Sequence, residues 1–218
     1  MRVANGTIEA LKYLALLLMT LDHINKYLFK AQLPYLFESG RLAMPIFGFV
    51  LAYNLARPAA LQNGVHLRVM KRLLAFGALA SIFLIPMVGW LPLNILFMLL
   101  VATCMIYLIE EPGHWNKLFA CLVFLVGGIL VEFWWLALAY CLAAWWFCKS
   151  PSIAKGLLWI IATASLSAVN HNAWALAALP VILLSPYIAI EIPRLRHVFY
   201  AYYPAHLAVL LAIQHLRT

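Results

Sequence analysis

The chain has 218 residues, of which 67% are hydrophobic and only 10% carry charge. Soluble domains carry charge on about a quarter of their residues, so this composition and a mean hydropathy of +0.95 exclude a soluble domain and predict an integral membrane protein. A net charge of +8 would suggest nucleic acid as the partner of a soluble protein. Here most cations flank apolar runs, where membrane topology explains them. We therefore expect membrane lipid, and no nucleic acid, around the chain.

Polar breaks and breaks that contain Pro or Gly divide the chain into nine apolar segments of the length that a membrane-spanning helix needs, about 20 residues. The sequence predicts a single all-α domain over residues 1–218, a polytopic transmembrane bundle. The expected spans are approximately 8–29, 40–57, 68–89, 92–109, 116–131, 133–149, 153–170, 173–190 and 198–216. The division between the fifth and sixth is the weakest, because only Gly127, Gly128 and Glu132 interrupt residues 118–148. Eight or ten spans would also fit.

The distribution of positive charge predicts the topology. With nine alternating spans and a cytoplasmic N-terminus, 11 of the 15 Lys and Arg residues lie in cytoplasmic segments. The four that fall outside are Lys26, Lys30, Arg41 and Arg217. Cytoplasmic loops are enriched in Lys and Arg, so we expect the N-terminus inside and the C-terminus outside. No small-residue cleavage site follows the first apolar run, and we expect that run to be a retained span rather than a signal peptide.

The four cysteines show no C-x-x-C spacing and all lie in apolar stretches. Neither a disulfide framework nor a zinc site is encoded, and we expect these residues to pack in the bundle as small apolar side chains. No metal is expected. Glu110 and Glu111 are adjacent acidic residues between the fourth and fifth expected spans. We expect that pair to lie in a solvated loop.

Function is expected in ionisable residues inside spans, where each costs several kcal/mol unless it is paired or hydrated. The strongest candidates are Asp22 and His23, near the outer third of the first span. Adjacent helical residues point about 100° apart, so the two side chains reach different partners; the alternative is an interfacial cap or a structural hydrogen-bonded pair. Arg41, at the outer start of the second span, would neutralise Asp22 or an oxyanion, or would serve as an interfacial anchor.

Two sets of cations face the cytoplasm. Lys12 precedes His23 by eleven residues, close to three helical turns or about 16 Å, so the two residues share a stripe that would hold both ends of one long ligand. The alternative is that Lys12 only reaches toward the headgroups. Arg68, Lys71 and Arg72 occupy positions i, i+3 and i+4 of the third span, a face that suits phosphates or serves as a topological anchor.

Weaker candidates occur in later spans. They are Asn54, Asn94, Glu132, the turn at 170–172, and the pair Tyr202 and His206. Tyr202 and His206 stand at i and i+4 on one helical face, although a single histidine in a bundle is most often a packing or hydrogen-bonding residue.

Several chemistries are excluded by absent residues. Asp22 is the only aspartate, which rules out a two-aspartate intramembrane protease and the H-x-x-x-x-D arrangement of glycerolipid acyltransferases. The chain also has no G-x-S-x-G, P-loop or H-E-x-x-H motif.

Four segments, in this order, resemble the TraX family of conjugative-transfer membrane proteins: LALLLMTLDHINKYL, SGRLAMPIFGFVLAYNLAR, LNILF and FYAYYPAHLAVLLAI. The resemblance covers nearly the whole chain. It implies pilin N-acetylation, an acetyltransferase activity in conjugation and type IV secretion. An acetyl group would pass from acetyl-CoA to the N-terminal amine of the processed conjugative pilin subunit at the bacterial inner membrane.

The TraX family is in turn similar to the acyltransferase-3 superfamily of membrane acyltransferases. Members of that superfamily carry a basic residue, ten intervening residues and a histidine in the first span, and an R-x-x-R pair near the third. Lys12 and His23 match the first pattern. Arg68 and Lys71 match the second with lysine in place of arginine, which keeps the charge but loses the bidentate fork.

The resemblance implies a mechanism. Acetyl-CoA would enter from the cytoplasm with its phosphates on Lys12, Arg68, Lys71 and Arg72. His23 would act as the general base that deprotonates the incoming amine, and Asp22 would orient a polar neighbour or pair with Arg41. Arg41 or Asn94 would stabilise the oxyanion. An acetyl-histidine intermediate fits these residues equally well.

Two other classes of function fit the sequence. One is acyl transfer to a surface sugar or polymer, since no separate domain recognises an acceptor. The other is a non-enzymatic role, as a chaperone or assembly factor for pilin or as a small transporter that uses Asp22, His23 and Glu132 as a proton path.

Overall fold

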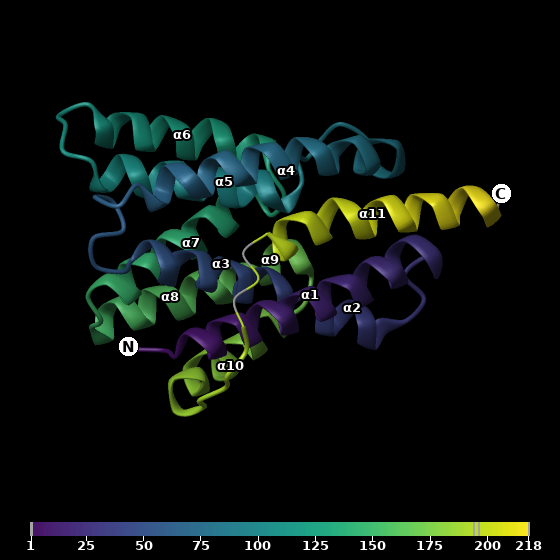
Figure 1. Cartoon of the computed structure of the whole chain (residues 1–218), viewed down its shortest axis with the longest axis horizontal. Coiled ribbons are helices and arrows are strands. Elements are labelled where there is room, and N and C mark those ends of the chain that lie inside the picture. Colours follow the sequence, from purple (N-terminus) through teal and green to yellow (C-terminus); the bar gives the residue numbers. More distant parts are fainter. Residues whose placement is uncertain (1, 194, 196, 218) are drawn as a thin grey trace.

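The computed structural model describes residues 2–193, 195 and 197–217 (Figure 1). The α-helices, in chain order, are α1 (Asn5–Leu28), α2 (Pro34–Gly40), α3 (Ala43–Leu55), α4 (Val65–Val88), α5 (Ile95–Glu110), α6 (Asn116–Leu130), α7 (Trp134–Lys149), α8 (Ile153–Ser165), α9 (Ser167–Asn170), α10 (Ala178–Leu184) and α11 (Val198–Arg217). Two 3-10 turns, η1 (Trp174–Ala177) and η2 (Ser185–Tyr187), flank α10. Within the described residues no strand is formed, and the all-α prediction is confirmed.

The long helices lie side by side along the long axis of the molecule, and α1 begins at the opposite end from the one where α11 finishes (Figure 1). Helix α3 runs antiparallel to α1, whereas α11 runs parallel to α1, because Thr20 contacts Tyr202 and, further along both helices, Tyr27 contacts Gln214. The Arg57 guanidinium, just after α3, donates to Asn5 Oδ1 at the start of α1 (2.9 Å), so the end of α3 lies beside the beginning of α1. α11 packs against both α4 and α1, which brings the C-terminal helix next to the first one.

Each of the nine predicted ranges contains a helix, but two differ in detail. The second range begins with a break, because the short helix α2 ends at Gly40 and α3 starts at Ala43. The eighth is reduced to α10 between two 3-10 turns. Pro186 lies two residues after the end of α10, within η2; proline has no N–H to continue the α-helical hydrogen bonds.

Among the residues that the structure describes, two helices are long and apolar enough to cross a membrane, Val65–Val88 and the continuous stretch Ile153–Asn170. Shorter apolar helices are Ile95–Glu110, Asn116–Leu130 and Trp174–Tyr187. Large apolar side chains are exposed on several helices, among them Ile82 (62%), Ile129 (63%) and Ile161 (64%). An apolar surface of this extent is costly in water, so these faces favour contact with lipid and support a membrane protein.

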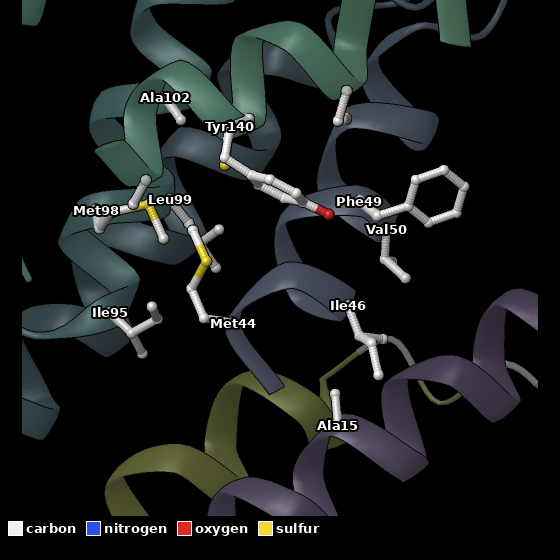
Figure 2. Close-up of a cluster of buried hydrophobic side chains, with 14 of the residues drawn as sticks. Ala15, Met44, Ile46, Phe49, Val50, Ile95, Met98, Leu99, Ala102 and Tyr140 are labelled. Atoms are coloured by element: carbon white, nitrogen blue, oxygen red, sulfur yellow. The ribbon is translucent and has the colours of Figure 1, made fainter. Parts of the chain in front are cut away.

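Helix α3 forms the centre of the core. Figure 2 shows Ile46 of α3 pointing toward Ala15 of α1, and Met44 of α3 lying toward Met98 and Leu99 of α5. The ring of Tyr140 of α7 points toward α3. The Tyr140 hydroxyl donates to the carbonyl of Pro45 (2.7 Å), which satisfies a polar group in an apolar interior. The buried core therefore fixes α3 against α1, α5 and α7, and so fixes the residues at both ends of α3.

Close contact between α3 and α7 depends on Gly48. A Cβ placed there would lie 2.9 Å from a ring carbon of Tyr140, so Gly48→Ala is expected to lower the free energy of unfolding by about 1–3 kcal/mol through overpacking. SDS-driven unfolding measures this. Gly156→Ala in α8 is the matched control, because its nearest neighbour would be Phe147 at 3.5 Å, an ordinary contact. Equal stability of the two variants would contradict the proposed packing constraint.

Candidate active site

A cavity of about 300 Å³ lies near one end of the bundle, and its lining includes Asp22, His23 and Arg41. Side chains from α1, α3, α5, α7, α9 and α11 contribute to its walls, together with the connections before α3, before α5 and between α6 and α7. The structure thus brings together the three residues that the sequence predicts to be catalytic, with Asp22 and His23 on α1 and Arg41 in the connection between α2 and α3. Their part in catalysis stays a prediction.

Asp22 and Arg41 form an ion pair in the wall of this cavity. Arg41 Nη2 lies 2.5 Å from Asp22 Oδ2, and the two side chains are 14% and 12% exposed. Arg41 Nε also donates to the Phe37 carbonyl (3.2 Å), and the guanidinium lies 4.3 Å from the centre of the Phe37 ring. The structure therefore shows the neutralisation of Asp22 that the sequence suggests.

Gly40 allows the two residues of this ion pair to approach each other. A Cβ at Gly40 would lie 2.4 Å from Asp22 Cβ, so only glycine lets the end of α2 approach α1 this closely. The other oxygen of the carboxylate, Asp22 Oδ1, is buried and has no hydrogen-bond partner among the described residues. Buried polar atoms are usually hydrogen-bonded, so this oxygen is an unsatisfied acceptor in a residue that lines the cavity.

His23 forms a pair with His206 of α11. His23 Nδ1 lies 2.8 Å from His206 Nε2, and His206 Nδ1 lies 3.0 Å from the carbonyl oxygen of Tyr202. A carbonyl only accepts, so His206 Nδ1 carries a proton and, in the neutral ring, Nε2 is the acceptor. His23 Nδ1 must then be the donor, which leaves His23 Nε2 unprotonated. His23 is therefore the Nδ1-protonated tautomer, whose Nε2 can act as a base.

The sequence left open whether Tyr202 and His206 approach the first helix, and the structure places both beside it. The Thr20 hydroxyl donates to the Leu16 carbonyl (2.7 Å), so the Tyr202 hydroxyl donates to Thr20 Oγ1 at 2.9 Å. Tyr202 and His206 therefore support α1 from behind the cavity. Tyr203 is the α11 residue that lines it.

Glu132 also lines the cavity, in the connection between α6 and α7. The connection is held by an isolated parallel bridge between Leu93 and Val131, in which the Glu132 N–H donates to the Leu93 carbonyl (3.0 Å). Burial raises the pKa of the Glu132 carboxyl to about 7. The sequence marks Glu132 as a break between spans and as one of the weaker functional candidates, because a carboxylate there interrupts a long apolar run.

Asn94 is a correction to the expected oxyanion donors. Its Oδ1 caps α5 by accepting from the Leu96 N–H (3.0 Å), and its Nδ2 donates to the Gly77 carbonyl (3.0 Å) and to Ser81 Oγ (3.1 Å). Both amide hydrogens are engaged, and Asn94 is not part of the cavity lining. Asn54 also lies away from the cavity and donates to the Val50 carbonyl of its own helix (2.8 Å). Both asparagines satisfy backbone groups.

The predicted phosphate-binding cations lie outside the cavity. Lys12 Nζ is 2.5 Å from Glu9 Oε2 and 4.3 Å from the centre of the Phe199 ring, and the Arg72 guanidinium is 6.0 Å from the ring of Tyr200. Lys12 and Arg72 therefore both approach the first turn of α11. The side chains of Arg68 and Lys71 are exposed on α4.

Glu110 is the second correction, because it is not in a solvated loop. It ends α5 with a side chain only 6% exposed, 3.3 Å from His66 Nε2, and it forms an ion pair with Lys149. The ends of α5 and α7 and the start of α4 meet there, so the carboxylate joins three helices.

Comparison with known proteins places this architecture in a family. The model of the family described as "TraX protein" matches residues 7–214. Among curated proteins, "Protein TraX" of Escherichia coli is 33% identical over 127 residues, which cover 57% of this chain and 49% of that protein. "Protein TraX" of Escherichia coli strain K12 is 34% identical over 128 residues, with the same two coverages. The chain thus matches about half the length of these relatives. No solved structure matches it significantly.

Proposed function

This chain belongs to the TraX family, and on that premise we propose that it is an acetyltransferase of the bacterial inner membrane. It would move an acetyl group from cytoplasmic acetyl-CoA to the N-terminal amine of a processed conjugative pilin subunit. The observation that carries this proposal is the cavity in which His23, with an unprotonated Nε2, lies beside the Asp22–Arg41 ion pair.

The proposed topology is a nine-span bundle with a cytoplasmic N-terminus. In this arrangement the end of α1 that carries His23 lies toward the outer side, where a pilin cleaved by signal peptidase presents its amine. Lys12 and the cations of α4 lie toward the cytoplasm, about 16 Å away from His23 along α1. The donor would span this distance, with its phosphates on Lys12, Arg68, Lys71 and Arg72 and its thioester near His23.

In the proposed reaction, His23 Nε2 accepts a proton from the incoming amine as the nitrogen attacks the thioester carbonyl carbon. Arg41 stabilises the negative charge that develops on the carbonyl oxygen. The C–S bond then breaks, and the CoA thiolate leaves and takes up the proton from His23. In the alternative route, His23 Nε2 itself attacks the thioester and an acetyl-histidine passes the group to the amine.

The direct test is the intact mass of a pilin co-expressed with this protein. A mass increase of one acetyl group, present with the wild type and absent with His23→Ala, would support the proposal. An increase of another size would change the identity of the transferred group. An unmodified pilin in both strains would overturn the proposal and favour a surface-polymer acceptor or a non-catalytic assembly role.

The cations of α4 give a second test. Arg68→Ala is expected to raise the Kd for acetyl-CoA about 3- to 10-fold, and the affinity of the wild type should fall with ionic strength because the site is exposed. Titration calorimetry of the purified protein measures both. Lys117→Ala is the matched control, an exposed cation of α6 that is also predicted to be cytoplasmic. Equal affinity for Arg68→Ala and the wild type would remove α4 from the donor site.

A further inference from the structure

The connection that carries Glu132 is strained. Phe133 and Trp134 have φ angles of 61° and 51°, in the left-handed region that residues other than glycine rarely adopt. The Leu93–Val131 bridge holds the connection in place, and Trp135 packs so closely on Gly128 that a Cβ there would lie 2.2 Å from its ring. Strain of this kind persists where the surrounding structure enforces it, commonly at functional sites.

The strained connection adds a carboxylate and two aromatic rings to the cavity. Glu132, Phe133 and Trp134 all line it, and Tyr27 and Tyr203 contribute further rings. Glu132 has no ion-pair partner within 4 Å among the described residues. A cavity lined by a carboxylate and by several aromatic rings suits an ammonium group, through charge and cation–π attraction.

The residues that line the cavity also provide hydrogen-bond acceptors, which an ammonium group requires. Asp22 Oδ1 is a buried acceptor with no partner among the described residues, and the hydrogen-bond pattern of the histidine pair leaves His23 Nε2 as a second acceptor. Glu132, in the carboxylate form that a bound cation would favour, is a third. A primary ammonium group has three N–H donors, so a cavity lined by residues with acceptors of this kind suits it.

We propose that this cavity is a binding site for the primary ammonium group of the acceptor, with Glu132 as its principal anchor; the bound ammonium group must release one proton to become the neutral amine that attacks the thioester. Lys26 and Arg41 also line the cavity and balance the charges of Asp22 and Glu132. Selectivity therefore comes from the placed acceptors rather than from net negative charge. The inference rests on the proposed acetyl transfer and adds that the acceptor is chosen for its amine, which disfavours the hydroxyl of a sugar.

The test measures peptide binding to the purified full-length protein without acetyl-CoA. The probes are a fluorescent hexapeptide of small apolar residues with a free N-terminal amine and the same peptide with hydrogen in place of that amine. We expect the wild type to bind the amine form about 10- to 100-fold more tightly, the range of a charge-assisted hydrogen bond. Glu132→Gln should reduce this ratio to about 2- to 3-fold, within the range of a neutral hydrogen bond. Glu38→Gln should preserve it, because Glu38 is a carboxylate of α2 that does not line the cavity.

Equal binding of both peptides by the wild type would overturn the inference, whatever the stability of the variants. An undiminished preference in a folded Glu132→Gln protein would overturn it as well, and Glu132→Asp provides a second variant that keeps the charge. Because the donor is absent, the result is independent of acetyl transfer. A wild type that acetylates pilin but shows no preference for the amine peptide would refute the ammonium site alone, and one that shows the preference but transfers no acetyl group would refute the proposed function alone.

Discussion

His23→Ala is expected to lower kcat for acetyl transfer by about 10²- to 10⁴-fold, the contribution of a positioned general base. The reason lies in the histidine pair, where His206 Nε2 accepts from His23 Nδ1 at 2.8 Å and leaves His23 Nε2 free to take the proton. Two imidazolium rings at this distance would repel each other, so the pair holds at most one additional proton. In the alternative covalent route the same substitution removes the nucleophile, with a loss at least as large.

The measurement is transfer from radiolabelled acetyl-CoA to the purified pilin, with kcat and KM determined separately. KM for acetyl-CoA should change little, because the proposed phosphate contacts are remote from His23. His215→Ala is the control, since His215 lies on α11 outside the cavity and bonds the Leu211 carbonyl of its own helix (3.0 Å). A His23→Ala protein that retains the wild-type kcat would exclude both the base and the nucleophile assignments.

The sequence predicts the helices well because their limits are local. Apolar runs end at Pro, Gly or polar clusters, and the break at Glu132 survives in the structure despite the long apolar stretch around it. Where a limit depends on tertiary contact, the prediction is poorer. The break between α2 and α3 exists because Gly40 meets Asp22 of a different helix, and nothing within the second range itself signals that approach.

The candidate site was predictable where a charge stood alone in an apolar segment. Asp22, His23 and Arg41 meet this criterion, and all three line one cavity. Asn94 and Glu110 were misread because the partners that engage them belong to other helices: Gly77 and Ser81 for the amide, His66 and Lys149 for the carboxylate. A polar residue near a helix end has a structural role if a neighbouring backbone group or charge satisfies it, and it is a candidate site residue if it faces a cavity. Only the fold distinguishes these two cases.

The second large effect is expected at the Asp22–Arg41 ion pair, where Asp22→Asn or Arg41→Gln should each lower the free energy of unfolding by about 3–5 kcal/mol. Each substitution leaves one charge in a site that is nearly closed to solvent, with side chains 14% and 12% exposed. Arg41→Gln also strands a carboxylate whose Oδ1 already lacks a partner among the described residues.

The double variant Asp22→Asn/Arg41→Gln tests charge compensation, because it removes both charges; Asn has the size of Asp, and Gln keeps a polar side chain that is shorter than Arg. Replacing both members of a buried ion pair with neutral groups costs less than removing one, so we expect the double variant to be more stable than either single variant in SDS-driven unfolding. Acetyl transfer should remain low in all three, since Arg41 is the proposed oxyanion donor and Asp22 holds it in place. If the two single losses simply add in the double variant, the charges do not compensate each other, and Arg41 then contributes to the fold through its contacts with Phe37 rather than through Asp22.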